Sequence, residues 1–156
     1  MTKPIPDGYH TLTPHLVVDG GADALDFYER AFGAEVRTRL DSGGMVMHAE
    51  VRIGDSLLTV SDAMPDFGLA APDTEGPVTS SLMIYCDDAD AMHARATAAG
   101  ATSINDVSDQ FHGDRAGSVR DPFGHRWAIA THTEDLSEAE VRKRFDEMMA
   151  GAGSDG

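Results

Sequence analysis

Asp23-Ala24-Leu25-Asp26-Phe27-Tyr28-Glu29-Arg30-Ala31-Phe32-Gly33-Ala34 is one of two stretches that decide the fold. The other is Asp90-Ala91-Met92-His93-Ala94-Arg95-Ala96-Thr97-Ala98-Ala99-Gly100-Ala101. The two have the same length, start at an Asp-Ala pair and end at Gly-Ala. In the first, Leu25, Tyr28 and Phe32 share one face of a helix, and a glycine commonly follows the last helical turn. The chain is therefore predicted to contain two copies of one unit, each built around a helix.

Strand-like segments surround both helices in the same order, with one before the helix and three after it. In the first half they span residues 11–18, 35–40, 45–53 and 56–61. In the second half they span residues 78–86, 102–107, 115–121 and 125–132. This order, β-α-β-β-β written twice, predicts an α+β fold in which each helix covers one face of a mixed, antiparallel-dominated sheet. The other face is then left for a cup, an interface or solvent.

The two units define the organisation of the chain. A length of 156 residues has room for one domain. We expect this domain to span about residues 5–136, with module 1 at about 10–62, a linker at 63–77 and module 2 at about 78–132. We further expect a C-terminal helix at 137–149 and a flexible tail at 150–156.

The predicted C-terminal helix begins with a capping box, because Ser137 and Glu140 have the required spacing. Its apolar positions recur at helical intervals and form a stripe. The members of this stripe are Val141, Phe145, Met148 and Met149. The stripe needs a partner, either the same chain or a second chain across a dimer.

Charge and composition exclude several classes of function. The chain has 12 Lys and Arg against 27 Asp and Glu, a formal charge of −15, which repels both nucleic acid and an anionic membrane. No apolar run is long enough to span a bilayer, and the start of the chain has no signal-peptide core. Cys86 cannot form an intrachain disulfide, and we expect it to be a buried, inert thiol. We therefore expect a cytoplasmic protein.

Several motifs occur in an order that resembles a known family. They are Thr13-Pro14-His15-Leu16-Val17-Val18-Asp19, Phe27-Tyr28 with Phe32-Gly33-Ala34, Met47-His48-Ala49-Glu50, 109–115 and Asp121-Pro122-Phe123-Gly124-His125-Arg126-Trp127. Together they resemble the glyoxalase/bleomycin-resistance/extradiol-dioxygenase (vicinal oxygen chelate) superfamily, and within it the small proteins sometimes mislabelled as demethylubiquinone methyltransferases. The resemblance implies a curved sheet, an open cup that receives a small molecule, and commonly a homodimer. It implies no methyltransferase, since the Gly-rich nucleotide-binding signature is absent from the sequence.

Alternation along the strands predicts which side chains face the cup. Leu12, Leu16 and Val18 are expected to point toward the helix, as are the apolar residues of the third strand. These are Met45, Met47, Ala49, Val51 and Ile53. The cup face then carries the candidate ligand-binding residues Thr13, His15, Thr59, Ser81, Tyr85 and His132, together with His48 and Glu50.

The metal-dependent members of the family place His, Gln and Glu ligands on the first and fourth strands of the two modules. The resemblance carries these positions to Thr13, to Thr59 or Leu58, to Ser81 and to Ala128. None of these side chains is a good ligand for a divalent ion. We therefore expect no metal site of the usual kind.

Two further sets of residues are candidates for chemistry. His15, His48 and Glu50 share a face by parity, so they are candidates for an unconventional two-His, one-carboxylate metal site. Without a metal, His48 and Glu50 are candidates for a catalytic pair, because a His beside a carboxylate is able to act as a general base near neutral pH. Arg115, near Asp109 and Asp114, either clamps a polar ligand at the rim or fixes a turn.

Three functions follow from these observations. The first is a homodimeric protein that binds a small molecule in the cup without the usual metal. The second is a metal-dependent lyase, isomerase or dioxygenase that uses the His/Glu set with a divalent metal. The third is a structural or interaction protein whose cup is filled by its own side chains or by the C-terminal helix.

Overall fold

We analysed a computed structural model of the chain and describe residues 1–153. The first module contains β1 (His15–Val18), α1 (Gly21–Phe32), β2 (Glu35–Ser42), β3 (Met45–Ile53) and β4 (Ser56–Asp62). The second contains β5 (Ser81–Tyr85), α2 (Ala89–Ala99), β6 (Thr102–Asp109), β7 (Asp114–Arg120) and β8 (Arg126–His132). A short 3-10 helix (Pro65–Phe67) lies between the modules, and α3 (Glu138–Ala152) follows the second. The predicted α+β class, the two βαβββ modules and the C-terminal helix are confirmed.

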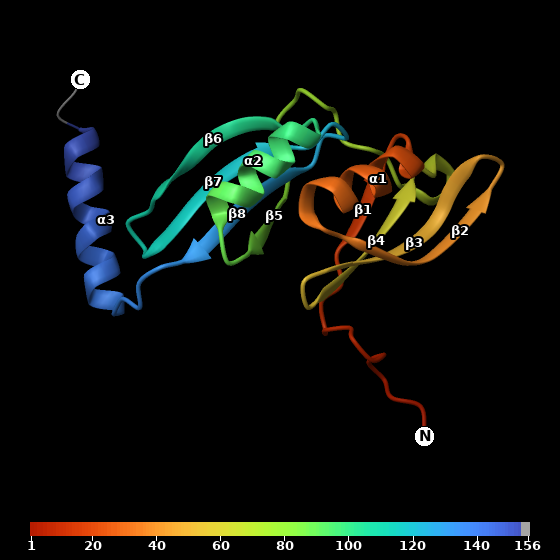
Figure 1. Ribbon diagram of the computed structural model, residues 1–156, viewed down its shortest axis with the longest axis horizontal. Helices are drawn as coiled ribbons and strands as arrows, with labels where there is room; N and C mark the ends of the chain where they lie inside the picture. Colours follow the sequence, from red (N-terminus) through yellow and green to blue (C-terminus); the bar gives the residue numbers. More distant parts are fainter. Residues whose placement is uncertain (154–156) are drawn as a thin grey trace.

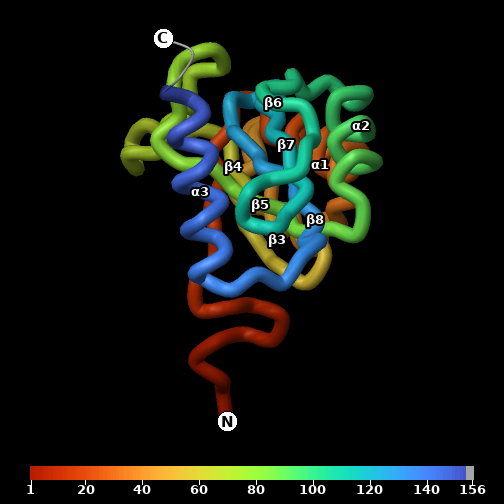
Figure 2. The backbone as a smooth tube through the Cα atoms, turned by 90° about the vertical axis from the view of Figure 1, so that its left-hand side faces the viewer, coloured from red at the N-terminus to blue at the C-terminus, as the bar shows by residue number. Residues whose placement is uncertain are grey.

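The modules have the same sheet topology. Their strand orders are β1-β4-β3-β2 and β5-β8-β7-β6. In each, the outer first strand pairs in parallel with the fourth strand, and the remaining pairs are antiparallel. The two sheets lie next to each other, and α1 and α2 contact each other on the same side of them (Figures 1 and 2). The duplication seen in the sequence is therefore a duplication of the whole four-stranded unit.

A buried carboxylate joins the two modules. Asp121 is 2% exposed, and its Oδ2 accepts hydrogen bonds from the Tyr28 hydroxyl at 2.8 Å and from Trp127 Nε1 at 2.9 Å. Its Oδ1 accepts the backbone N–H groups of Phe123 and His125, both at 2.9 Å. Four donors satisfy this carboxylate in a core where an unpaired charge would be costly. The Asp-Pro-Phe-Gly turn of module 2 is thus tied directly to α1 of module 1.

The start of α1 is fixed by a side chain from β4. Asp62 Oδ1 accepts the backbone N–H groups of Gly20 and Gly21, both at 2.9 Å, and its Oδ2 accepts that of Val46 at 2.8 Å. A carboxylate at this end satisfies free N–H groups and matches the helix dipole. A Cβ on Gly21 would lie 2.8 Å from Asp62 Oδ2 and from Val46 Cβ. Glycine is therefore required by the close approach of the helix to the sheet.

Two predictions of which side chains point toward the helix were wrong. Leu12, expected to point inward, is 84% exposed, because β1 begins only at His15 and alternation does not extend past Pro14. In β3, Met45 and Met47 are exposed and Val46 is buried. The pairing of β3 with β2 shifts register between Leu40 and Asp41, and such a bulge reverses the facing of the residues on one side of it. Beyond the bulge, Ala49, Val51 and Ile53 are buried as predicted.

The C-terminal helix lies outside both modules, next to the β6–β7 end of module 2 (Figure 1) and on the opposite side from α2 (Figure 2). One of the two hydrogen bonds of its predicted capping box is present, since the Ser137 hydroxyl accepts the N–H of Glu140. Phe145 contacts Phe111 of the β6–β7 turn, with ring centroids 5.6 Å apart, and Arg144 pairs with Glu134. The helix reaches Ala152, so it includes the start of the predicted tail; residues 154–156 of that tail lie outside the described residues.

Candidate functional site

Polar side chains form a row across the face of the first sheet that α1 does not cover. In the strand register His15 lies beside Thr59, Thr59 opposite Glu50, and Glu50 opposite Thr38. Their neighbours along the strands, such as Leu16, Val51 and Val60, are buried against the helix. Because successive residues of a strand point to opposite faces, the row faces away from α1.

His15 lies at the centre of the hydrogen bonding in this row. Its Nδ1 is 2.6 Å from Thr59 Oγ1, and its Nε2 is 3.1 Å from Ser61 Oγ. Burial, and secondarily the nearby His48, lower the pKa of His15 below its usual value. A neutral imidazole has one donor and one acceptor nitrogen, and a hydroxyl is able to complement either. The site thus holds an uncharged His15 between two hydroxyl groups.

Glu50 supplies the negative charge of the row. Hydrogen bonds from Tyr9 and Thr38, with the nearby His48 and Arg37, hold the pKa of Glu50 below its usual value despite partial burial. His48 Nε2 lies 3.9 Å from Glu50 Oε1, with side chains 40% and 31% exposed. The two are therefore close, but their separation is longer than a normal hydrogen bond. We call this group the His15 cluster; its members are Tyr9, His15, Thr38, His48, Glu50, Thr59 and Ser61.

A hollow of about 320 Å³ opens beside His15. Its walls are His15 and Val17 of β1, the connecting segment from Ala70 to Ser80, and Gly124 and His125 of the β7–β8 turn. His125 Nε2 donates to the Val17 carbonyl at 2.9 Å, which fixes the turn against β1. We call this space the His15 hollow. It is within the size range of small-molecule sites.

The second module has a polar cluster of its own, centred on the buried Asp114. The Tyr85 hydroxyl donates to Asp114 Oδ2 at 2.7 Å, and His132 Nδ1 donates to Oδ1 at 2.8 Å. His112 Nδ1 lies 3.5 Å away, and His132 Nε2 contacts Asp135 at 2.9 Å. Burial raises the pKa of Asp114, but the bonds from His132 and Tyr85 outweigh it and leave the pKa lowered. The same contact to Asp114, with that to Asp135, raises the pKa of His132.

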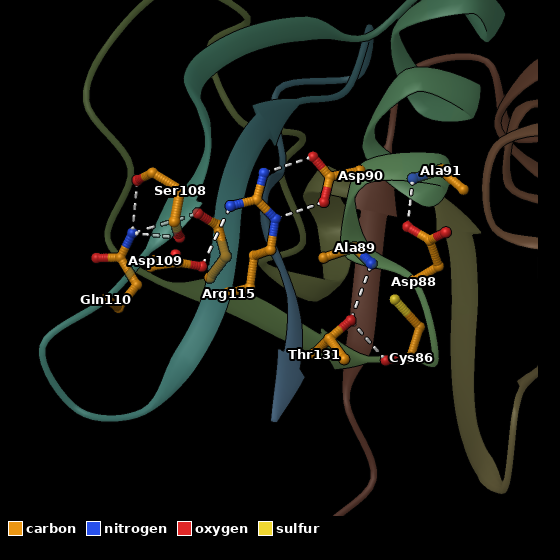
Figure 3. Close-up of polar contacts among 11 residues, drawn as sticks. Cys86, Asp88, Ala89, Asp90, Ala91, Ser108, Asp109, Gln110, Arg115 and Thr131 are labelled. Carbon is orange, nitrogen blue, oxygen red and sulfur yellow. Dashed lines mark hydrogen bonds and ion pairs between the residues drawn. The ribbon is translucent and has the colours of Figure 1, made fainter. Parts of the chain in front are cut away.

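Arg115 lies on the opposite face of the second sheet, with α2. Its guanidinium makes two hydrogen bonds to Asp90 of α2, at 2.6 and 2.8 Å, and one to Asp109 at 3.2 Å (Figure 3). These ion pairs connect the start of α2 to the β6–β7 hairpin. Of the two alternatives for Arg115, the structure therefore favours fixing the local fold over clamping a ligand.

The same close-up shows the environment of Cys86 (Figure 3). The Thr131 hydroxyl donates to the Cys86 carbonyl and accepts the N–H of Ala89, both at 2.9 Å. The thiol is half-buried, and burial is the main cause of its raised pKa. A raised pKa disfavours the reactive thiolate, which agrees with the expected inert role.

The structure brings some predicted site residues together and separates others. His15, Thr59, His48 and Glu50 form one group, whereas Tyr85 and His132 meet at Asp114. Thr13 lies before β1, and Ser81 is the exposed first residue of β5. Neither makes a side-chain hydrogen bond within residues 1–153.

Sequence reasoning missed three residues of these clusters. Tyr9 comes from the segment before β1, where no periodicity places it. Thr38 shares the helix-free face with Glu50, and the parity of β2 would have found it. Asp114 was considered only as a rim residue, and its burial depends on the pairing of β7 with β8.

The usual metal site of the resembled family does not fit this chain. Thr13, Thr59, Leu58, Ser81 and Ala128 offer at most hydroxyl oxygens, which bind divalent ions weakly. The alternative set of His15, His48 and Glu50 does not converge either, since both ring nitrogens of His15 contact hydroxyls. Over residues 1–153, no group of three or more His, Cys, Asp or Glu side chains is arranged to hold a metal ion.

No helix in the described part of the chain is long and apolar enough to cross a membrane.

Comparisons with known proteins agree with the fold and the motifs. Residues 9–129 match the family model of the glyoxalase/bleomycin resistance protein/dioxygenase superfamily. An uncharacterised protein of Mycobacterium tuberculosis is 36% identical over 135 residues, which cover 84% of this chain and 79% of that protein. Its similarity extends over nearly the whole domain.

Solved structures show the same architecture. TioX from Micromonospora sp. ML1 is 26% identical, with a TM-score of 0.64 over 79% of this chain and 98% of that one. The Bacillus cereus PhnB protein, which carries the name of a 3-demethylubiquinone-9 3-methyltransferase, is 19% identical, with a TM-score of 0.59 over 78% of this chain and 99% of that one. The latter likeness concerns the fold alone. On the family match and the duplicated modules, this chain belongs to the glyoxalase/bleomycin resistance protein/dioxygenase superfamily.

Proposed function

We propose that this protein binds a small molecule in the His15 hollow without the family's usual metal. One observation carries the proposal: the polar row of the first sheet ends at His15, which borders a hollow of about 320 Å³. The hydroxyls of Thr59 and Ser61 hold His15 in place, so a ligand would meet an already oriented imidazole. Preorganised polar groups reduce the entropy lost on binding.

The charges of the site favour a neutral or cationic ligand that carries hydrogen-bond donors. Glu50 has a lowered pKa and is ionised at neutral pH, whereas His15 has a lowered pKa and is uncharged. The whole chain has a formal charge of −15, which attracts cations and repels anions over long range. His48, whose Nε2 lies 3.9 Å from Glu50 Oε1, is the candidate to accept a proton from such a ligand.

A thermal-shift screen with neutral and cationic compounds tests the proposal, since a ligand that binds the folded state raises the melting temperature. We expect hits whose shift is lost in His15→Ala and reduced in Glu50→Gln. Glu138→Gln is the matched control, because it removes one carboxylate from the first turn of α3 and leaves the row intact. If the same hits shift His15→Ala as much as the wild type, ligands bind elsewhere and the proposal fails.

The metal part of the proposal has a separate test. We expect the ligand-induced shift to be the same with and without a chelator. Elemental analysis of the purified protein, with His48→Ala as the comparison, is the second readout. A stoichiometric metal that is lost in His48→Ala would overturn the metal-free proposal and favour the lyase, isomerase or dioxygenase alternative.

We also propose that the protein is a homodimer, as the family resemblance implies. The exposed apolar side chains of α3 support this, since Phe145, Met148 and Met149 are 38%, 46% and 54% exposed. Analytical ultracentrifugation tests it. We expect a dimer whose dissociation constant rises in Met148→Glu, whereas a monomeric wild type would contradict the proposal.

A further inference from the structure

A second hollow, of about 760 Å³, lies over the second sheet on the other side of the connecting segment. Pro77 and Val78 line both hollows and so separate this one from the His15 hollow. Its floor is Thr102 of β6, Arg120 of β7 and Arg126 of β8. We call it the Arg126 hollow, after the arginine on its floor whose contacts are described below.

The three floor residues lie in one row of the sheet. Thr102 pairs with Arg120, Arg120 with Arg126, and Arg126 with Ser81 of β5.

Arg120 and Arg126 differ in their hydrogen bonding. Arg120 donates to the backbone carbonyls of Gly124, Gly76 and Asp73, which holds the connecting segment on the sheet. The guanidinium of Arg126 has no hydrogen bond or ion pair with any residue of 1–153. Arg115, Arg120 and Arg144 are half-buried like Arg126, and each of them has acceptors. Arg126 is thus a partly desolvated cation without an anion, in a chain with a large excess of carboxylates.

The position of Arg126 makes an anionic partner favourable. Like charges directly opposite each other on neighbouring strands destabilise a sheet, and Arg126 faces Arg120 in this way. An anion between or beside them would remove the repulsion. A guanidinium also presents a planar fork of N–H donors that matches a carboxylate.

The remaining walls restrict the kind of anion. Pro77, Val78, Pro122 and the 41% exposed Ile104 give the hollow an apolar side. Glu75 also lines it, which opposes a doubly charged group such as phosphate more than a single carboxylate. Asp121 also lines the hollow, but four hydrogen-bond donors in the core engage both of its oxygens, so it is not the acceptor for Arg126.

We propose that the Arg126 hollow is a binding site for an organic monocarboxylate with an apolar body. The carboxylate contacts the Arg126 guanidinium, with the hydroxyls of Thr74 and Thr102 as neighbours, and the apolar body lies on Ile104, Val78 and Pro122. This site is separate from the His15 hollow. Its ligand class differs in charge from the one proposed for that hollow.

Isothermal titration calorimetry of the full chain with octanoate tests the proposal, with octylammonium and inorganic phosphate as the other two probes. At the Arg126 hollow we expect octanoate to bind, and octylammonium and phosphate to bind at least tenfold more weakly. Octylammonium binding that Arg126→Gln leaves unchanged belongs to the His15 hollow. Arg126→Gln should weaken octanoate binding by about tenfold or more, the loss of one charge-assisted bidentate contact. Glu75→Gln should strengthen it by a few fold, because a repulsive carboxylate is removed.

Arg142→Gln is the matched control, since it removes an exposed arginine of α3 and leaves the hollow unchanged. It should bind octanoate as the wild type does.

Equal weakening of octanoate binding in Arg126→Gln and Arg142→Gln would mean a general charge effect and would overturn the proposed site. Octylammonium or phosphate binding that is as tight as octanoate binding and is equally weakened by Arg126→Gln would overturn the assigned ligand class. A wild type that does not bind octanoate would overturn the whole proposal. Opposite shifts in Arg126→Gln and Glu75→Gln keep the test independent of folding defects, because misfolding weakens binding in both.

Discussion

Removing the Tyr28 hydroxyl is expected to weaken the connection between the two modules. Tyr28 is fully buried, and its hydroxyl donates to Asp121 Oδ2 at 2.8 Å. Tyr28→Phe leaves the ring and its packing against Trp127 in place, with centroids 5.6 Å apart. The carboxylate keeps its other donors but loses the one that comes from module 1. The change therefore isolates one hydrogen bond to a buried charge.

The size of the effect follows from the burial of both partners. A hydrogen bond to a charged group contributes about 1.5–3 kcal/mol, and no water replaces the hydroxyl in a closed core. We expect Tyr28→Phe to lower the free energy of unfolding by about 2 kcal/mol. For a chain of this length that corresponds to a fall of roughly 4–8 °C in melting temperature. Chemical denaturation, supported by differential scanning calorimetry, measures both quantities.

Tyr85→Phe is the matched control. Tyr85 also donates to a buried aspartate, Asp114 at 2.7 Å, but its side chain is 60% exposed, so water can take the place of the hydroxyl. We expect a loss of less than about 1 kcal/mol. Equal losses in Tyr28→Phe and Tyr85→Phe, or a loss below about 0.5 kcal/mol in Tyr28→Phe, would refute the reasoning from burial.

Three further predictions concern titration and packing. The pKa of His132 is raised by its hydrogen bonds to two carboxylates, so its contribution to stability is complete below about pH 6.5 and is lost as the pH rises through the folded-state pKa. His132→Gln should therefore be less stable than the wild type in mild acid, with a difference that shrinks in base, as denaturation at a series of pH values will show. The pKa of His15 is lowered by burial and by His48, so NMR titration should give a midpoint below that of a free histidine, and His48→Ala should move it upward. Gly21→Ala should cost about 1–3 kcal/mol because its Cβ would meet atoms at 2.8 Å, whereas Gly151→Ala, with nothing within 4 Å, should cost nothing measurable by denaturation.

The periodicity of the sequence predicts where the helices and strands lie. It does not predict, for every strand, which side chains point toward the core. Periodicity places α1 and α2 within two residues of their observed ends, because Leu25, Tyr28 and Phe32 repeat at helical spacing and a glycine follows, whereas α3 continues three residues past its predicted end. The predicted directions of the β3 side chains are confirmed after the bulge and wrong before it. A bulge depends on how β2 pairs with β3, and the sequence of β3 alone carries no signal for it.

The candidate site was predictable to the extent that it lies within strands. Parity placed His48, Glu50 and Thr59 on one face, and the structure brings them near His15. The two hollows could not be predicted, because both are walled by the irregular connecting segment, whose course follows from the hydrogen bonds of Arg120 to its carbonyls.

The sequence by itself determined the duplicated βαβββ order, the acidic character and the lack of good metal ligands at the family's usual positions, since these depend on residue type and local spacing. The tertiary structure decided which charged side chains have hydrogen-bond or ion-pair partners. Asp121 and Arg120 are bonded to distant segments, whereas the Arg126 side chain has no such partner among residues 1–153. Such pairing depends on where separate segments pack against one another, and local periodicity does not encode that contact.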